Sequence, residues 1–119
     1  MQLESYALVL LRRGPSAAGF ADDELERLQD AHLGHLAAMA GAGKLVAAGP
    51  FSGQPDDSLR GLCFYACPVE EARRLAEADP AVRAGRLAVE VMTWSTRAGS
   101  VSFRRPGVPP SAAPPAGCH

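Results

Sequence analysis

Hydrophobic and polar positions in the first half of the chain predict a strand followed by an amphipathic helix. Residues 6–11 form a continuous apolar run that Arg-Arg-Gly-Pro closes, which is typical of a strand buried on both faces. Residues 24–40 carry apolar side chains at helical spacing, about 100° of rotation per residue. One sector of the helical wheel holds Leu25, Leu28, Leu36 and Met39, and the opposite side holds Arg27, Asp30 and Gly34. His32 lies at the centre of the apolar sector, where a leucine would serve packing better.

Residues at both ends of this helix predict its limits. Asp23 is placed to cap the N-terminus, with Glu26 three residues later as its partner in a capping box. Gly41 and Gly43 supply the left-handed conformations at which helices end.

The second half of the chain predicts three further strands and a second helix. Residues 45–48 form a short apolar strand, residues 51–58 a loop, and residues 59–67 a third strand. A helix then begins at Pro68 and is broken at Ala78-Asp79-Pro80, because a proline disfavours helical geometry in the residue before it. Residues 81–85 form a short turn or a single helical turn, and alternating apolar positions over residues 87–94 then predict the last strand.

The resulting order, β-α-β-β-α-β, predicts an α+β fold of the ferredoxin-like type, a four-stranded antiparallel sheet with both helices on one face. Residues 1–97 make up this domain, and a shift to Pro, Ala, Gly and Ser predicts that residues 98–119 are a C-terminal tail without a core of its own. Apolar residues also occupy the other face of the sheet. Because soluble monomers rarely expose a patch of that size, the pattern predicts a homodimer formed through the open sheet face.

Composition and charge exclude several classes of protein. The formal net charge of the 119 residues is -1 and like charges occur at most in pairs, so no nucleic-acid footprint is present. No segment approaches the ~20 apolar residues that cross a bilayer, and the N-terminus lacks the features of a signal peptide, so we expect a cytoplasmic protein without a membrane partner. The spacing of Cys63, Cys67 and Cys118 favours neither a disulfide framework nor a zinc site.

His32 is the main chemical feature that the pattern offers, and two interpretations of it stay open. A neutral imidazole near pH 7 can take or give a proton, and a carboxylate beside it would fix its tautomer. A core histidine whose nitrogen donates to a backbone carbonyl fits the same position. His32 and His35 could share a metal ion, but no third ligand is spaced nearby, so we expect no metal site.

Motifs over residues 5–96 resemble the YCII family in their order and spacing. The motifs are the strand of residues 6–11, His32-Leu-Gly-His-Leu36, Gly43-Lys-Leu-Val-Ala-Ala-Gly-Pro-Phe51, Arg60-Gly-Leu62, Glu70-Glu-Ala72, Ala78-Asp-Pro80, Gly85-Arg-Leu87 and Val91-Met-Thr-Trp94. The resemblance implies the dimeric α+β barrel fold, related to muconolactone isomerase-type enzymes. It also implies a catalytic pair, for which His32 matches the family histidine and Asp79 the family aspartate.

The resemblance implies a small cofactor-independent enzyme that uses this pair for proton transfer on a small cyclic or aromatic-derived substrate. The one family activity that we would name is dehydrochlorination of a chlorinated hydroxyhydroquinone, a lyase reaction, and an isomerase is equally compatible. A non-catalytic small-molecule-binding or accessory protein is the alternative function. For Asp79 alone, capping of the turn after Pro80 is an alternative role, and one carboxylate can serve both purposes.

Further residues are candidates for the substrate pocket. They are His35, Gly49, Pro50, Tyr65 and Trp94. Gly49-Pro50 would shape a loop of the pocket rather than bind a phosphate, because no helix follows it. Glu90 either points into the barrel as a second acid or base or faces water from its strand.

Overall fold

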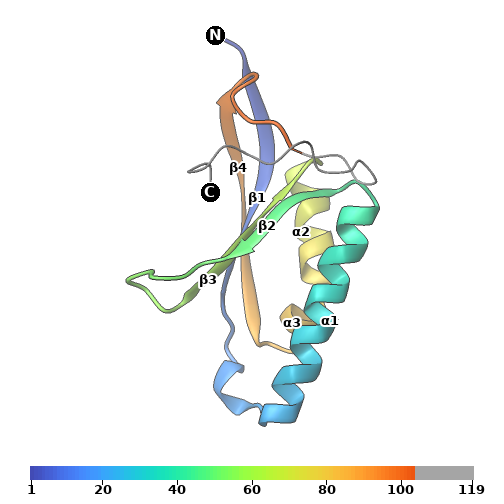
Figure 1. Cartoon of the computed structure of the whole chain (residues 1–119), viewed down its shortest axis with the longest axis vertical. Helices are drawn as coiled ribbons and strands as arrows, with labels where there is room; N and C mark the ends of the chain where they lie inside the picture. Colours follow the sequence, from blue (N-terminus) through green and yellow to red (C-terminus); the bar gives the residue numbers. More distant parts are fainter. Residues whose placement is uncertain (104–119) are drawn as a thin grey trace, which may run out of the picture.

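The fold is α+β, with four antiparallel strands in one sheet and the helices packed on one of its faces. The structure is a computed structural model and describes residues 1–103. In chain order the elements are β1 (Leu3–Arg13), a 3-10 turn (Ala17–Gly19), α1 (Asp22–Gly41), β2 (Leu45–Pro50), β3 (Leu59–Tyr65), α2 (Val69–Glu77), α3 (Pro80–Arg83) and β4 (Leu87–Arg97). The strand order is β2-β3-β1-β4, with every pairing antiparallel. Figure 1 shows α1, α2 and α3 on the same side of the sheet. The predicted fold class is confirmed.

The core lies between the sheet and the helices and is organised by the inward-facing residues of β1. Ala7, Val9 and Leu11 are buried, and Val9 has Cys63 of β3 and Val91 of β4 as its neighbours across the strands. Because side chains alternate along a strand, the other face carries the even-numbered positions of β1. Burial therefore assigns the odd-numbered positions of β1 to the helix side.

The N-terminus of α1 differs from the predicted one. The helix begins at Asp22, Ala21 is the N-cap residue, and the Glu24 carboxylate accepts a hydrogen bond of 3.1 Å from the Ala21 backbone N–H. The predicted capping box of Asp23 and Glu26 is therefore wrong by two residues, although its spacing of three is correct. Several consecutive acidic residues in the first turn offer more than one possible N-cap position with the same spacing. The path of the chain before Ala21 decides which position is used.

Other element limits shift by a few residues. The third strand ends at Tyr65 rather than at residue 67, and a last hydrogen bond from the Ala66 N–H to the Lys44 carbonyl continues its pairing with β2 by one residue. Of the two alternatives for residues 81–85, the structure has the helical one, α3, and α2 ends at Glu77, as the Ala78-Asp79-Pro80 break predicts. None of the described helices is long and apolar enough to cross a membrane.

The open face of the sheet is apolar. Tyr6 lies opposite Trp94, and Leu8 lies between Phe64 and Met92. The first residues after β4 return to this face, where the Phe103 ring packs edge-on against Tyr6 at a centroid distance of 5.0 Å. The rest of the predicted tail, residues 104–119, lies outside the described residues.

A close approach of two backbones joins the end of β1 to the start of β4. The Gly14 N–H donates to the Arg86 carbonyl, and a Cβ atom at Gly14 would lie far inside van der Waals contact with the Gly85 carbonyl oxygen. Gly85 itself has φ +82°, a conformation that favours glycine. The two segments can approach this closely because neither position carries a side chain.

We expect Gly14→Ala to destabilise the protein by about 2 kcal/mol, because an added methyl group would separate these segments. Gly34→Ala is the matched control, since Gly34 lies inside α1 with open space around its Cα. It should stabilise the protein by about 0.5 to 1 kcal/mol. Urea unfolding of both variants measures the difference, and equal stabilities would contradict the packing argument.

Candidate active site

The structure brings His32 and Asp79 into direct contact from positions 47 residues apart. The Nδ1 atom of His32, on the inner face of α1, lies 2.5 Å from Oδ2 of Asp79, at the start of α3. Both residues are buried, with 9% of His32 and 2% of Asp79 exposed. The second carboxylate oxygen of Asp79 accepts a hydrogen bond of 2.9 Å from the Ala81 N–H. Asp79 therefore caps α3 and holds the imidazole at the same time.

Local sequence explains how each partner reaches this position. His32 is the one residue of α1 that is classed as buried, as its place at the centre of the apolar sector predicts. Asp79 precedes Pro80, which starts α3, so its backbone is extended and its side chain turns back over the first N–H groups of that short helix. The contact between α1 and α3 then depends on how the two helices pack on the sheet.

The contact with Asp79 determines which nitrogen of His32 is free. An ionised carboxylate only accepts hydrogen bonds, so Nδ1 carries the proton and donates it to Oδ2. The other nitrogen, Nε2, then has a lone pair, and within residues 1–103 it has no hydrogen-bond partner. A neutral imidazole in this tautomer is a proton acceptor at Nε2.

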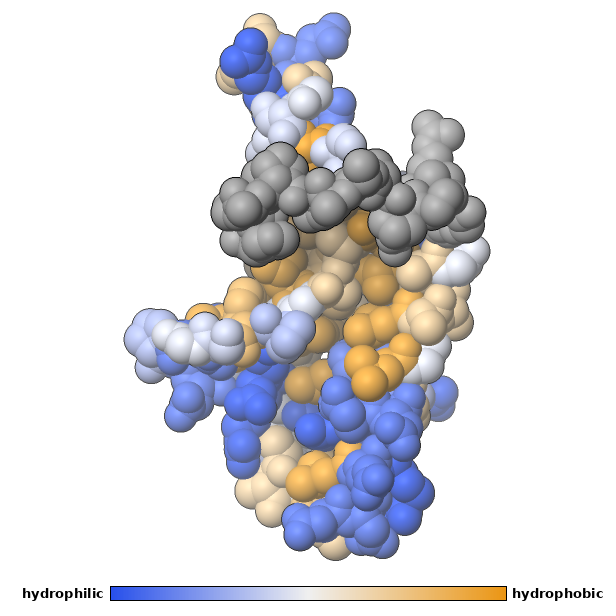
Figure 2. Space-filling model, viewed as in Figure 1, coloured by the Kyte–Doolittle hydropathy of each residue, from blue (hydrophilic) through white to orange (hydrophobic). Residues whose placement is uncertain are grey.

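His32 lies in the wall of a cavity of about 530 Å³ between α1 and the sheet. The cavity is lined by Leu11, Arg13, Ala17, Leu25, Gln29, His32, Leu33, Leu36, Ala48, Gly49, Pro50, Arg60, Gly61, Leu62, Cys63, Arg86 and Leu87. Figure 2 shows hydrophobic surface along the part of α1 that faces the β2–β3 hairpin, with hydrophilic surface below it. A volume of this size suits a small organic molecule.

Two other buried titratable side chains lie near the pair and stay protonated. Burial, with the nearby Asp79 charge, raises the pKa of the Cys63 thiol to about 12. Burial also raises the pKa of Tyr65 well above its usual value. Because a thiol needs its thiolate form to react, Cys63 lines the cavity as a small apolar residue and not as a nucleophile.

The remaining predicted pocket residues divide into two groups. Gly49 and Pro50 line the cavity, but they are the last residues of β2 and not part of a loop, because they pair with Leu62 and Gly61 of β3. His35 does not, since its Nε2–H donates a hydrogen bond of 2.9 Å to the Leu75 carbonyl and joins α1 to α2. Tyr65 is 1% exposed in the core beside Ala7, outside the cavity lining.

Two candidates lie on the open face of the sheet, away from the cavity. Trp94 is opposite Tyr6 and packs near Phe64. Glu90 is exposed and accepts a hydrogen bond from Arg12 Nε, so it faces water from its strand and does not enter the cavity. The alternation of β4 puts both residues on this face, and the sequence could not tell which face would meet the helices.

Sequence reasoning missed the arginines of the cavity. Arg13, Arg60 and Arg86 come from three separate segments and converge only in the folded chain. Two of them, Arg60 and Arg86, lie in the motifs Arg60-Gly-Leu62 and Gly85-Arg-Leu87 that resemble the YCII family, and this is the one sequence signal that could have drawn attention to them. No cluster of three or more metal-binding side chains occurs in the described part of the chain.

The topology and the buried pair define an α+β domain of the ferredoxin-like type with a histidine–aspartate contact beside a cavity. Residues 6–95 match the model of the YCII-related domain, and the chain belongs to that family. No curated protein matches the sequence. A solved structure with a similar fold is 5-chloro-2-hydroxyhydroquinone dehydrochlorinase (TftG) from Burkholderia phenoliruptrix AC1100, in complex with 2,5-dihydroxybenzoquinone. That similarity has a TM-score of 0.46 and 22% sequence identity, and covers 81% of this chain and 92% of that chain.

Proposed function

We propose that this protein is a small enzyme that needs no cofactor and in which His32, held by Asp79, transfers a proton on a small cyclic or aromatic-derived substrate. The observation that carries the proposal is the buried contact between His32 and Asp79 in the wall of the cavity. Burying a carboxylate and an imidazole costs desolvation free energy, and such buried ionisable pairs cluster at functional sites. A histidine–aspartate pair of this kind can catalyse elimination of the dehydrochlorinase type, a lyase reaction, or isomerisation.

The mechanism uses Nε2 as the general base. Nε2 takes a proton from a carbon beside a carbonyl group, and the electron pair of the C–H bond moves onto the carbonyl oxygen to form an enolate. The imidazolium that results is stabilised by the Asp79 carboxylate, 2.5 Å from Nδ1. Return of the proton to a different carbon completes an isomerisation, whereas departure of chloride from the neighbouring carbon completes an elimination. The apolar walls of the cavity lower the local dielectric constant and so strengthen the attraction between the imidazolium and the Asp79 carboxylate.

Proton transfer can be tested before the natural substrate is known. In D₂O, NMR should detect exchange of the hydrogens beside the carbonyl group in at least one member of a panel of small cyclic ketones and enones. Chloride release from 5-chloro-2-hydroxyhydroquinone tests the elimination directly. The alternative, a non-catalytic binding protein, requires a panel member that binds with the same affinity to the wild type and to His32→Gln, with neither exchange nor chloride release.

We also propose that the active form is a homodimer joined through the open sheet face. The support is the apolar character of that face, where Leu8 is flanked by Phe64 and Met92, and 41% of Met92 is exposed. Two such faces packed about a two-fold axis would remove the patch from water.

Leu8→Asp should therefore produce a monomer at micromolar concentration in sedimentation equilibrium, because the aspartate would be buried without a partner at the interface. Leu3→Asp is the matched control, since Leu3 is 58% exposed on the opposite face of the same strand and should leave the dimer intact. A wild-type protein that sediments as a monomer would refute the proposal.

A further inference from the structure

All the charged side chains that line the cavity beside His32 are arginines, and none is a carboxylate. Arg13 ends β1, Arg60 lies in β3 and Arg86 precedes β4, and the lining contains no Asp or Glu side chain. The one carboxylate described at this site, Asp79, lies behind the imidazole and is 2% exposed. The charge that a ligand meets on entering the cavity is therefore positive.

These three guanidinium groups have no ion-pair partner among the described residues. By contrast, Arg12, which is next to Arg13 in the sequence, is paired with both Asp56 and Glu90 on the other face of the sheet. Cations left unpaired around a partly enclosed, apolar-walled cavity raise its electrostatic potential and attract anions.

Arg86 contacts the same helix, α1, that carries the imidazole. Its Nη1 atom donates to the Gln29 side-chain oxygen at 3.3 Å and to the Leu25 carbonyl at 3.4 Å. Gln29 precedes His32 by one helical turn, so both side chains project from the same face of α1. Arg86 is half-buried and keeps further N–H groups free, whereas Arg13 and Arg60 are exposed at the rim.

We infer that the substrate carries a carboxylate, which Arg86 binds while Arg13 and Arg60 attract it at the rim. The planar guanidinium forms paired hydrogen bonds with a carboxylate, and the apolar side chains of Leu25, Leu33 and Leu36 line the cavity for the hydrocarbon part. The inference names the substrate class for the proposed function and rests on it, but the binding step can be measured without turnover.

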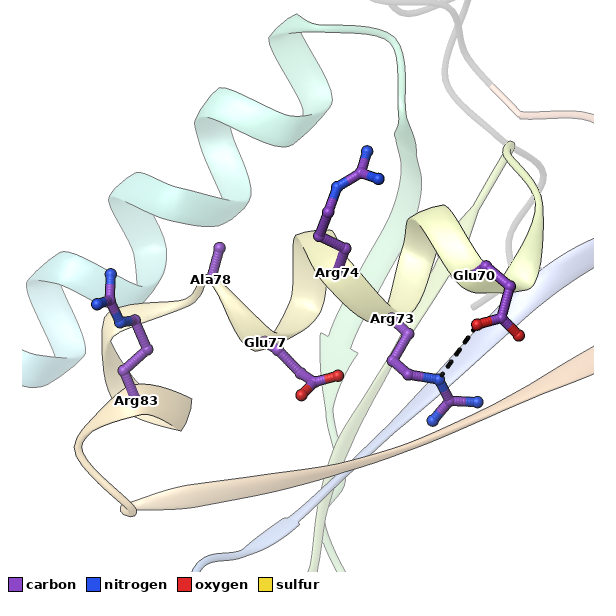
Figure 3. Close-up of a pocket in the computed structure, with 6 residues that line it drawn as sticks. All are labelled: Glu70, Arg73, Arg74, Glu77, Ala78 and Arg83. Carbon is purple, nitrogen blue, oxygen red and sulfur yellow. Dashed lines mark ion pairs between the residues drawn. The ribbon is translucent and has the colours of Figure 1, made fainter.

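A second hollow in the surface is also lined by arginines, but acidic side chains lie among them. It measures about 380 Å³ and is lined by Glu70, Arg73, Arg74, Glu77, Ala78 and Arg83. Figure 3 shows Arg73 directed toward Glu70, with 4.0 Å between their charged atoms, while Arg74 points away from both. The charges of this hollow are of mixed sign and do not converge, so it serves as the comparison site.

The inference is tested by isothermal titration of the full chain with benzoate and with benzamide, which has nearly the same shape without the charge. We expect benzoate to bind at least about tenfold more tightly than benzamide. Arg86→Gln should remove about tenfold of the benzoate affinity and leave benzamide unchanged. Arg83→Gln, at the comparison site, should change neither affinity. Added NaCl should weaken benzoate binding, because the rim cations are exposed to screening.

Further variants keep the result separate from folding and from catalysis. Arg86 also contacts α1, so its replacement could affect folding as well as binding. The double variant Arg13→Gln/Arg60→Gln avoids this problem because it alters only exposed side chains, and it should lower the benzoate affinity several-fold. His32→Gln should keep the preference for benzoate, so a failure of the acid–base proposal leaves this result standing. Equal affinities for benzoate and benzamide, no benzoate binding, an unchanged affinity in the arginine variants, or tighter binding of inorganic phosphate than of benzoate would each overturn the inference.

Discussion

We expect Asp79→Asn to fold and yet to lose turnover by about 10² to 10⁴-fold, the range in which general bases contribute. The asparagine oxygen can still accept the hydrogen bond from the Ala81 N–H, so the cap of α3 is kept. Its NH₂ group then faces Nδ1 of His32 and donates to it. Nδ1 must accept, the ring proton moves to Nε2, and the nitrogen that faces the cavity can no longer take a proton.

Two measurements check this expectation. The rate of deuterium exchange or chloride release measures turnover, and ¹⁵N NMR of the His32 ring reports the tautomer without any substrate. His35→Gln is the control, because its amide can still donate to the Leu75 carbonyl while it contributes nothing to the cavity. An Asp79→Asn variant with the wild-type rate would show that the carboxylate does not position the base.

We expect Asp79→Ala to destabilise the protein by about 3 kcal/mol. Loss of the cap on α3 accounts for about 1 kcal/mol. The rest, about 2 kcal/mol, comes from leaving the buried Nδ1 of His32 without a partner. Urea unfolding followed by circular dichroism measures the sum.

A matched series separates these two contributions. Asp79→Ser keeps a side-chain oxygen for the cap but is too short to reach His32, so it should cost about 2 kcal/mol rather than 3. His32→Leu/Asp79→Ser removes both buried polar partners and should be more stable than the sum of the single variants predicts. Wild-type stability in Asp79→Ala would mean that the contact makes no net contribution to folding.

The sequence predicted the element order and the face of α1 that packs inward, because both follow from local periodicity. The apolar sector around His32 is the buried face of α1. The face of β1 that meets the helices was not predicted, because this strand is apolar on both faces. Element ends were less well predicted, as the start of α1 at Asp22 shows. Ends depend on single hydrogen bonds, and several neighbouring residues can make them.

The pocket was predicted less completely than the pair. Tyr65 and Trp94 are aromatic residues in strands, and nothing in their neighbourhood tells which face of the sheet or which end of the core they occupy. The three arginines escaped notice for the complementary reason, because charged residues at the ends of strands are usually solvent-exposed and without a role.

The sequence alone determined the order of strands and helices and the burial of an imidazole on the apolar face of a helix. Both depend on residues that are close to each other in the chain. Only the tertiary structure decided that Asp79 meets His32, and that Arg13, Arg60 and Arg86 surround one cavity. Those contacts join segments far apart in the chain, and they form because burying the apolar faces of α1 and α3 on one sheet fixes where the polar side chains between them must lie.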